Sequence, residues 1–244
     1  MKQFAGRVAV VTGGGRGIGR SIASRLAREG AIVVISARTK SEIEKAASEM
    51  RAVGGDVTAI VADALEPDSA RVPIYCAINR FGRIDILVNN VGGVIGTHNS
   101  RFGGDESFEA TLRLNLLTPW WAITAALPTM HDQAYGRIIN IGSTESQRAN
   151  AGCPPAYVAA KHGVAGLTRQ LAQDVGDSGI TVNGAVSRMR TRLHGARRSL
   201  NTAELRRRGS ATRRGLPSGE ACRSAGQRGG VRLGSGWRSR RERR

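Results

Sequence analysis

Short apolar runs alternate along the chain with longer segments whose apolar residues recur at helical spacing, such as Ile22, Ala23 and Leu26. Short runs of this kind are typical of buried strands. They occupy residues 8–11, 32–35, 57–61, 84–88, 138–141 and 180–182. The helical segments include residues 21–28, 41–53, 108–130 and 157–175. Strands that alternate with helices predict an α/β fold, in which a doubly wound parallel sheet is covered by helices on both faces and binds ligands at the carboxyl ends of its strands.

A glycine-rich turn follows the first apolar run directly. Gly13, Gly17 and Gly19 lie between this expected strand and the first expected helix. Side chains here would block the close approach of a pyrophosphate, and the amides at the helix start supply hydrogen-bond donors and a partial positive charge. The alternative is a tight turn that needs positive φ and holds no ligand. The order of strand, turn and helix favours a nucleotide site.

Tyr157 and Lys161 lie four residues apart in the last expected helix, so the phenol and the ammonium share one helix face. A tyrosine ordinarily keeps its proton until a pH of about 10, and a neighbouring cation lowers that pKa. Such a pair could pass a proton to or from an alcohol or a ketone. Alone, the same spacing also fits two side chains on a solvated helix.

Together these motifs resemble the short-chain dehydrogenase/reductase family. Further landmarks of the family follow in order: Asp63, the turn that contains Asn90 and Gly92, then Asn115 and Ser143. The likeness runs from about residue 4 to residue 185, roughly three quarters of the chain. It implies a Rossmann-like version of the doubly wound sheet.

The resemblance also implies an activity: hydride transfer between NADP(H) and a carbonyl or secondary alcohol. In this reading Tyr157 is the general acid/base, and Lys161 lowers the pKa of Tyr157 and holds the nicotinamide ribose. Ser143 would hydrogen-bond the substrate oxygen. Asn115 would support a water molecule that links Lys161 to solvent. The small-molecule partner is therefore a ketone or an alcohol.

Two of these roles have rivals nearby. Thr144 and Ser146 follow Ser143 closely, so either hydroxyl could be the true substrate contact. Asn115 lies in an amphipathic segment and could instead hydrogen-bond only to the backbone.

Cofactor choice is predicted from the residues after the second expected strand. An acidic residue about twenty positions past the glycines would bind the ribose 2′-hydroxyl of NAD, but Ala37 occupies that place. Arg38 follows it and can pair with the 2′-phosphate of NADP, and Arg16 could add a second cation. If Arg38 is only a solvated turn residue, NAD remains possible. The expected cofactor-binding residues are Gly13, Arg16, Gly17, Ile18, Gly19, Arg38, Asp63, Asn90, Gly92, Tyr157 and Lys161.

The chain changes character near residue 187. Residues 187–244 hold 18 Arg, no Lys and 3 Glu, so they carry most of the net charge of +18. They contain no Ile, Phe or Tyr and only six Val plus Leu, too few apolar side chains to offset the entropy of ordering. We therefore expect a dinucleotide-binding and catalytic domain over residues 1–186. A disordered Arg/Gly/Ser-rich tail would follow over residues 187–244.

Two hypotheses account for this tail. Members of the family continue after Ile-Thr-Val-Asn with a Pro-Gly turn, a substrate-covering segment and a last strand, and none of these follows residue 187. A shift of the reading frame near Ser187 explains that loss, and it would leave an inactive dinucleotide-binding remnant if the missing cover is essential. Alternatively, the tail is genuine and binds nucleic acid through its arginine runs at 206–208 and 238–244.

The remaining composition narrows the class of protein. Cys76, Cys153 and Cys222 are odd in number and widely spaced, which argues against a disulfide framework and fits a reducing cytoplasm. The four histidines have no metal-ligand spacing, so we expect no metal. No apolar run is long enough for a signal peptide or a membrane span, so no membrane partner is expected. The family resemblance implies a homo-oligomer if the fold is complete.

Overall fold

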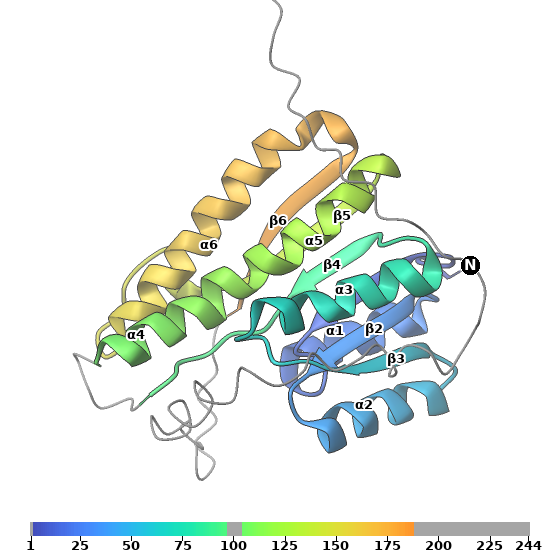
Figure 1. Ribbon diagram of the computed structural model, residues 1–244, viewed down its shortest axis with the longest axis horizontal. Helices are drawn as coiled ribbons and strands as arrows, with labels where there is room; N and C mark the ends of the chain where they lie inside the picture. Colours follow the sequence, from blue (N-terminus) through green and yellow to red (C-terminus); the bar gives the residue numbers. More distant parts are fainter. Residues whose placement is uncertain (1, 97–103, 188–244) are drawn as a thin grey trace, which may run out of the picture. The chain divides into compact units, whose positions relative to one another are not determined.

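A computed structural model describes residues 2–96 and 104–187 of the 244-residue chain (Figure 1). The strands are β1 (Val8–Thr12), β2 (Ile32–Ala37), β3 (Asp56–Val61), β4 (Ile86–Asn89), β5 (Gly136–Ser143) and β6 (Ile180–Ser187). The α-helices are α1 (Gly17–Arg28), α2 (Lys40–Ala52), α3 (Pro67–Phe81), α4 (Asp105–Leu112), α5 (Thr118–Asp132) and α6 (Pro155–Asp174). Three short helical turns complete the fold: η1 (Arg113–Leu117), η2 (Thr144–Ser146) and η3 (Gly176–Ser178).

The strands form one sheet in the order β3-β2-β1-β4-β5-β6, and every neighbouring pair is parallel. Residues of β1 lie between the two halves, since Ala9 pairs with Val33 on one side and with Ile86 on the other. The strand order reverses between β1 and β4, and ligands of such sheets bind at the carboxyl ends next to this reversal. The predicted α/β doubly wound fold is confirmed.

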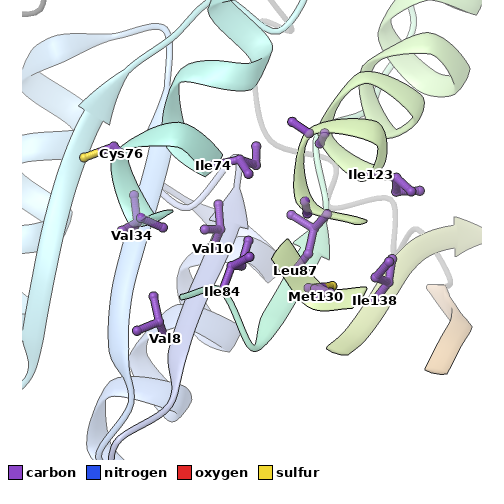
Figure 2. Close-up of a cluster of buried hydrophobic side chains, with 14 of the residues drawn as sticks. Val8, Val10, Val34, Ile74, Cys76, Ile84, Leu87, Ile123, Met130 and Ile138 are labelled. Atoms are coloured by element: carbon purple, nitrogen blue, oxygen red, sulfur yellow. The ribbon is translucent and has the colours of Figure 1, made fainter. Parts of the chain in front are cut away.

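The first face of the sheet carries the larger core. Helices α3, α5 and α6 cover this face, and their apolar side chains meet those of the strands. Ile74 of α3 and Ile123 of α5 are fully buried there (Figure 2). The strand residues in this core include Val8, Val10, Val34, Leu87 and Ile138. The last expected helix is thereby held against β5 and β6.

The second face is covered unevenly. Helices α1 and α2 pack on it against β1, β2 and β3, with Leu26 and Ile43 in the core. Over β5, Ile139 and Ile141 are only partly buried, and Thr181 and Asn183 of β6 are exposed. The described helices that contact β5 and β6 most, α5 and α6, lie on the first face. Within residues 2–96 and 104–187, half of the second face therefore has no helix over it.

A buried carboxylate fastens the amino ends of β1 and β4, opposite the ligand edge. Asp85 accepts hydrogen bonds from Arg7 (2.8 Å), from Arg83 (2.6 and 2.8 Å) and from the amide of Val8 (2.9 Å). Burial raises the pKa of Asp85, but the hydrogen bonds from Arg83, Val8 and Arg7 outweigh it, so that the pKa lies below its ordinary value. The ring of Tyr135 lies between two cations, with the guanidinium of Arg7 3.9 Å from its centroid.

The observed elements refine the expected ones. The segment expected as one helix over residues 108–130 consists of α4, the π-helical turn η1 and α5. Strand β5 runs to Ser143, so the candidate serine is the last residue of that strand. Of the expected tail, only Ser187 belongs to the described residues, where it ends strand β6, and the disorder expected for the rest of the tail lies outside them. None of the described helices is long and apolar enough to cross a bilayer.

Candidate active site

The residues expected to bind the cofactor and substrate lie at the carboxyl edge of the sheet. The glycine turn follows β1, Arg38 follows β2, Asp63 follows β3, and Asn90 and Gly92 follow β4. Ser143 ends β5, Asn115 lies in η1, and Tyr157 and Lys161 lie on α6. The topology therefore brings together a turn near the start of the chain and a helix 140 residues later.

The glycine turn depends on close backbone packing. A Cβ on Gly19 would lie 2.4 Å from the carbonyl oxygen of Gly13 and 2.4 Å from Nδ2 of Asn90. Gly13 (φ 68°) and Gly17 (φ 56°) have positive φ, which favours glycine. Nothing lies within 4 Å of a Cβ placed on Gly17, so the start of α1 faces open space.

Helix α1 begins without a protein cap. Arg16 at its N-cap makes no capping hydrogen bond, and the first turn contains no acidic residue. The free amides and the partial positive charge at this end are suited to an anion such as a phosphate. Ile18 in the first turn is 48% exposed and could lie against a bound group.

Asn90 holds the glycine turn in place. Its Nδ2 donates to the carbonyl oxygens of Thr12 (3.0 Å) and Gly13 (3.3 Å). In return, Oγ1 of Thr12 accepts hydrogen bonds from the amides of Asn90 (3.0 Å) and Val91 (3.3 Å). Sequence analysis did not assign Thr12 to the site, although it directly precedes the glycines. Its hydroxyl connects the two loops on either side of the sheet reversal.

One of the two arginines expected to bind a 2′-phosphate lies near a carboxylate that sequence analysis missed. Arg38 is exposed after β2, and Arg16 reaches across to Glu42, with its Nε 3.9 Å from Oε1. The same Oε1 atom would lie 2.9 Å from a Cβ on Gly15. Glu42 therefore reaches the glycine turn from the first turn of α2. The available signal was an acidic residue four positions past Arg38.

The loop after β3 is shaped by Asp63. Its Oδ1 accepts a hydrogen bond from the amide of Leu65 (3.1 Å), and its own amide donates to Oγ of Ser69 (2.8 Å). These bonds fix the backbone at the end of β3, beside the expected adenosine end of the site.

Lys161 is anchored to the sheet. Its Nζ donates to the carbonyl oxygen of Ile141 (3.0 Å) and lies 5.6 Å from the ring centroid of Tyr157. The lysine side chain is buried, and burial lowers its pKa to about 8. The ammonium is thus held between β5 and α6 and loses its proton more readily than an exposed lysine.

The structure corrects one expectation about Tyr157. Its pKa is raised rather than lowered, first because the phenol is buried and also because the charge of Glu145 and the thiol of Cys153 disfavour the phenolate. A hydrogen bond with Ser143 acts in the opposite direction but is outweighed. Lys161, whose Nζ lies 5.6 Å from the ring centroid of Tyr157, does not reverse this balance.

Asn115 lies against both Gly92 and the lysine. Its Nδ2 donates to the carbonyl oxygens of Gly93 (2.6 Å) and Thr111 (2.8 Å), and its Oδ1 accepts from the amide of Gly93 (3.0 Å). A Cβ on Gly92 would lie 2.8 Å from Oδ1 of Asn115 and 3.2 Å from Nζ of Lys161. The π-helical turn is a feature often found at functional sites. In the described residues the Asn115 amide is engaged by backbone, as the rival interpretation expected.

The three neighbouring hydroxyls have different partners. Oγ of Ser143 donates to Oε2 of Glu145, and the same serine lowers the pKa of Tyr157. Ser146 accepts from the amide of Ser143 (3.0 Å), which caps the turn η2. Thr144 donates to Oε2 of Glu145 (2.9 Å). Of these hydroxyls, the one on Ser143 is the one placed beside the phenol.

Glu145 is the second carboxylate that sequence analysis missed. Hydrogen bonds from Ser143, Asn150 and Thr144 lower its pKa to about 2, with the Ser143 bond the largest cause and burial opposing. Nδ2 of Asn150 donates to Oε1 at 2.7 Å. The acidic residue was visible two positions after Ser143, but nothing in the spacing indicated that it binds the serine.

Comparison with known proteins agrees with this arrangement. The family model described as short chain dehydrogenase matches residues 7–198. The 1,6-dihydroxycyclohexa-2,4-diene-1-carboxylate dehydrogenase of Pseudomonas putida is 36% identical over 203 residues, 83% of this chain and 73% of that protein. The 3-oxoacyl-(acyl-carrier-protein) reductase FabG of Pseudomonas aeruginosa is 39% identical over 178 residues, 73% of this chain and 71% of that protein.

A solved structure extends the comparison to the fold. A metagenomic short-chain oxidoreductase in complex with NADP has a TM-score of 0.70 and 30% identity, covering 76% of this chain and 82% of that one. Sequence and fold thus lead to the same assignment, which also agrees with the glycine turn and the tyrosine–lysine pair at one sheet edge. The chain belongs to the short-chain dehydrogenase/reductase family of oxidoreductases.

Proposed function

We propose that this chain uses NADP(H) to interconvert a carbonyl compound and a secondary alcohol, with Tyr157 as the general acid/base. The observation that carries the proposal is that Ser143 at the end of β5, and Tyr157 and Lys161 on α6, are buried at the same sheet edge as the uncapped start of α1. Phosphate-binding features and proton-transfer groups at one edge suit a dinucleotide-dependent oxidoreductase.

The residues around the glycine turn fit a dinucleotide. The turn from Gly13 to Gly19 and the free amides of α1 would hold the pyrophosphate, and Asp63 would lie at the adenine. Arg38 and Arg16 would pair with a 2′-phosphate, and Ala37 offers no acid for a 2′-hydroxyl. The metagenomic relative, whose structure is a complex with NADP, supports the same preference. When bound, the nicotinamide supplies the hydride acceptor or donor.

The side chains at the end of β5 and on α6 would manage the proton. During alcohol oxidation, the substrate carbon gives up a hydride and its oxygen gives up a proton to the phenolate oxygen of Tyr157, a form that, because of the raised pKa, becomes more abundant only as the pH increases. During reduction, the Tyr157 hydroxyl returns that proton to the carbonyl oxygen. Ser143 would donate a hydrogen bond to the reacting oxygen, and Lys161 would hold the nicotinamide ribose. Asn115 would hold a water molecule that connects Lys161 to solvent.

Substrates named for two relatives indicate the chemical range. One relative is named for a cyclic dihydroxy carboxylate and another for a 3-oxoacyl group carried on a protein. Both compounds present a secondary carbinol or a ketone carbon. We propose a small-molecule ketone or alcohol of this kind as the substrate.

Binding and turnover test the proposal separately. We expect the chain to bind NADPH more tightly than NADH in fluorescence titrations, and to oxidise or reduce members of a panel of secondary alcohols and ketones. Tyr157→Phe should retain NADPH binding and lose turnover, whereas Tyr75→Phe, on an exposed face of α3, should change neither. Failure to bind either dinucleotide would overturn the assignment.

A second candidate is an inactive dinucleotide-binding remnant. The half-covered second face favours it, because Ile139 and Ile141 are only partly buried and β6 is exposed along Thr181 and Asn183. NADPH binding without turnover of any panel compound, in the wild-type chain as in Tyr157→Phe, would identify this state.

A further inference from the structure

The carboxylate of Glu145 lies beside the candidate catalytic serine without a cation to neutralise it. Its Oε2 accepts hydrogen bonds from Ser143 and Thr144, and its Oε1 accepts one from Asn150. Among the described residues, no Lys, Arg or His nitrogen lies within 4.0 Å of either oxygen. A carboxylate held only by neutral donors keeps its full charge and some of its acceptor capacity.

The hydroxyl proton of Ser143 is already donated within the protein. A serine hydroxyl has one proton to donate and two lone pairs that accept. Oγ donates its proton to Glu145, and it accepts a long hydrogen bond from the amide of Glu145 (3.4 Å). To donate to a substrate oxygen, Ser143 must therefore release Glu145.

Releasing Glu145 has a cost unless another donor replaces the serine. An ionised carboxylate that loses a hydrogen bond in a partly buried site is destabilised, and hydrogen bonds to charged groups are among the stronger ones. A second hydroxyl on the substrate, next to the reacting carbinol, would donate the missing hydrogen bond to Oε2. The Ser143 hydroxyl could then donate to the reacting oxygen instead. A substrate with a single hydroxyl offers no such replacement.

We infer that Glu145 is a specificity-determining residue that selects substrates with a second hydroxyl adjacent to the reacting carbon, namely vicinal diols and the corresponding α-hydroxy ketones. The inference rests on the proposed function, because it assumes that Ser143 contacts the reacting oxygen. By contrast, Glu145 would repel a substrate that carries a carboxylate at the position of the second hydroxyl.

The surroundings of Glu145 keep its carboxylate in position when the hydrogen bond from Ser143 is replaced by one from the substrate. Asn150 and Thr144 fix the carboxylate, and the turn η2 that carries it is capped from both sides by Ser143 and Ser146. Because these bonds also hold the pKa of Glu145 at about 2, the group is an acceptor throughout the neutral pH range. Of its neutral donors, Ser143 is the one that also lowers the pKa of Tyr157.

Binding of two matched alcohols tests the inference without requiring turnover. Isothermal titrations would be made in saturating NADPH with cis-1,2-cyclohexanediol and with cyclohexanol, which differ only in the second hydroxyl. For the wild-type chain we expect the diol to bind about tenfold more tightly, the worth of one hydrogen bond to a charged group. Glu145→Gln should bring this ratio close to one while leaving cyclohexanol affinity unchanged or higher.

Asp177→Asn provides a matched control. It also removes one carboxylate charge, but Asp177 is exposed and lies before the amino end of β6, at the edge opposite the site. The control should keep the wild-type preference for the diol.

A second readout follows the phenol directly. Because the charge of Glu145 disfavours the phenolate of Tyr157, Glu145→Gln should lower the pH at which that phenolate absorbs in the ultraviolet, with Tyr157→Phe identifying its signal. An unchanged titration would overturn the contact on which the inference depends. Equal affinity for the two alcohols, or no binding of either in a chain that binds NADPH, would overturn the inference alone. Failure to bind NADPH would instead contradict the proposed function on which the inference rests.

Discussion

The Nζ atom of Lys161 lies 3.0 Å from the carbonyl oxygen of Ile141, so the ammonium bridges α6 and the carboxyl end of strand β5. The lysine side chain is only 4% exposed, and no carboxylate lies within ion-pairing distance among the described residues. A buried, unpaired ammonium costs stability that a purely structural residue would not cost. Its presence is therefore better explained by chemistry than by packing.

Replacing this lysine should stabilise the fold in a pH-dependent way. Burial lowers the pKa of Lys161 from 10.5 to about 8, so between these values the unfolded chain holds a proton that the folded chain has released. Stability of the wild-type chain therefore rises with pH across this window. We expect Lys161→Met to raise the free energy of unfolding by about 1 kcal/mol at pH 7 and to lose this advantage by pH 10.5.

Urea denaturation at the two pH values measures this effect. Lys45→Met, at an exposed position of α2, should show no such pH-dependent difference from wild type. An advantage for Lys161→Met that persists undiminished at pH 10.5 would contradict the explanation.

Removing the charge of Glu42 should favour NADPH. Glu42 partly neutralises Arg16 at 3.9 Å and would repel a 2′-phosphate, although both side chains are substantially exposed and solvent screens the effect. We expect Glu42→Gln to tighten NADPH binding about threefold, with little change for NADH. Glu44→Gln is the matched control, since Glu44 pairs with Lys40 one turn away. Equal gains for both dinucleotides would refute a role for the 2′-phosphate.

Two glycine substitutions should have opposite effects. Gly19→Ala would place a Cβ 2.4 Å from the Gly13 carbonyl oxygen, so the turn must shift, and we expect loss of NADPH binding and a fall in stability of about 2 kcal/mol. Gly166 lies in α6 with nothing within 4 Å of a Cβ, so Gly166→Ala should stabilise the helix by about 0.5–1 kcal/mol. Thermal unfolding and NADPH titration of both variants check this, and similar behaviour of the two would contradict it.

Asp85 should matter for stability and not for cofactor binding. Asp85→Asn leaves Arg7 and Arg83 without their buried partner, and we expect a loss of about 3 kcal/mol at pH 7. The pKa of Asp85 is lowered, so its contribution is present above the unfolded value near 3.8 and is lost as the pH falls through the folded pKa. The variant should therefore resemble wild type most closely in acid. A constant difference from pH 7 down to pH 2.5, in urea unfolding, would contradict this assignment.

The reading-frame hypothesis makes a prediction about the coding DNA. Sequencing codons 180–200 and translating the other two frames downstream should reveal a Pro-Gly turn, a covering segment and a final apolar strand. If no frame contains them, the arginine-rich tail is a genuine product. Salt-sensitive binding to DNA or RNA that disappears on truncation after Val186 would then be expected.

Local pattern predicted much of this molecule because the relevant signals lie within single segments. The apolar period identified the six strands, and Tyr157 and Lys161 share a helix face by spacing alone. Helix α3 was not among the helical segments expected from the sequence, and it contains Pro73, a residue unfavourable in a helix interior.

The two carboxylates of the site could not be recognised in the same way. Glu42 and Glu145 gain their meaning from contacts with Arg16 and Ser143, which depend on how helices and strands meet. The direction of the Tyr157 pKa likewise depends on burial, which the spacing of two residues does not contain.

The uneven cover of the sheet divides the domain into a more stable half, called firm below, and a less stable half, called fragile. Strands β1 to β3 are packed on both faces, whereas β5 and β6 are packed mainly on one. Amides of β5 and β6 should therefore exchange with solvent well before those of β1 and β2. The glycine turn belongs to the firm half and Ser143 to the fragile half. On heating, the chain should therefore lose catalytic turnover at a lower temperature than dinucleotide binding.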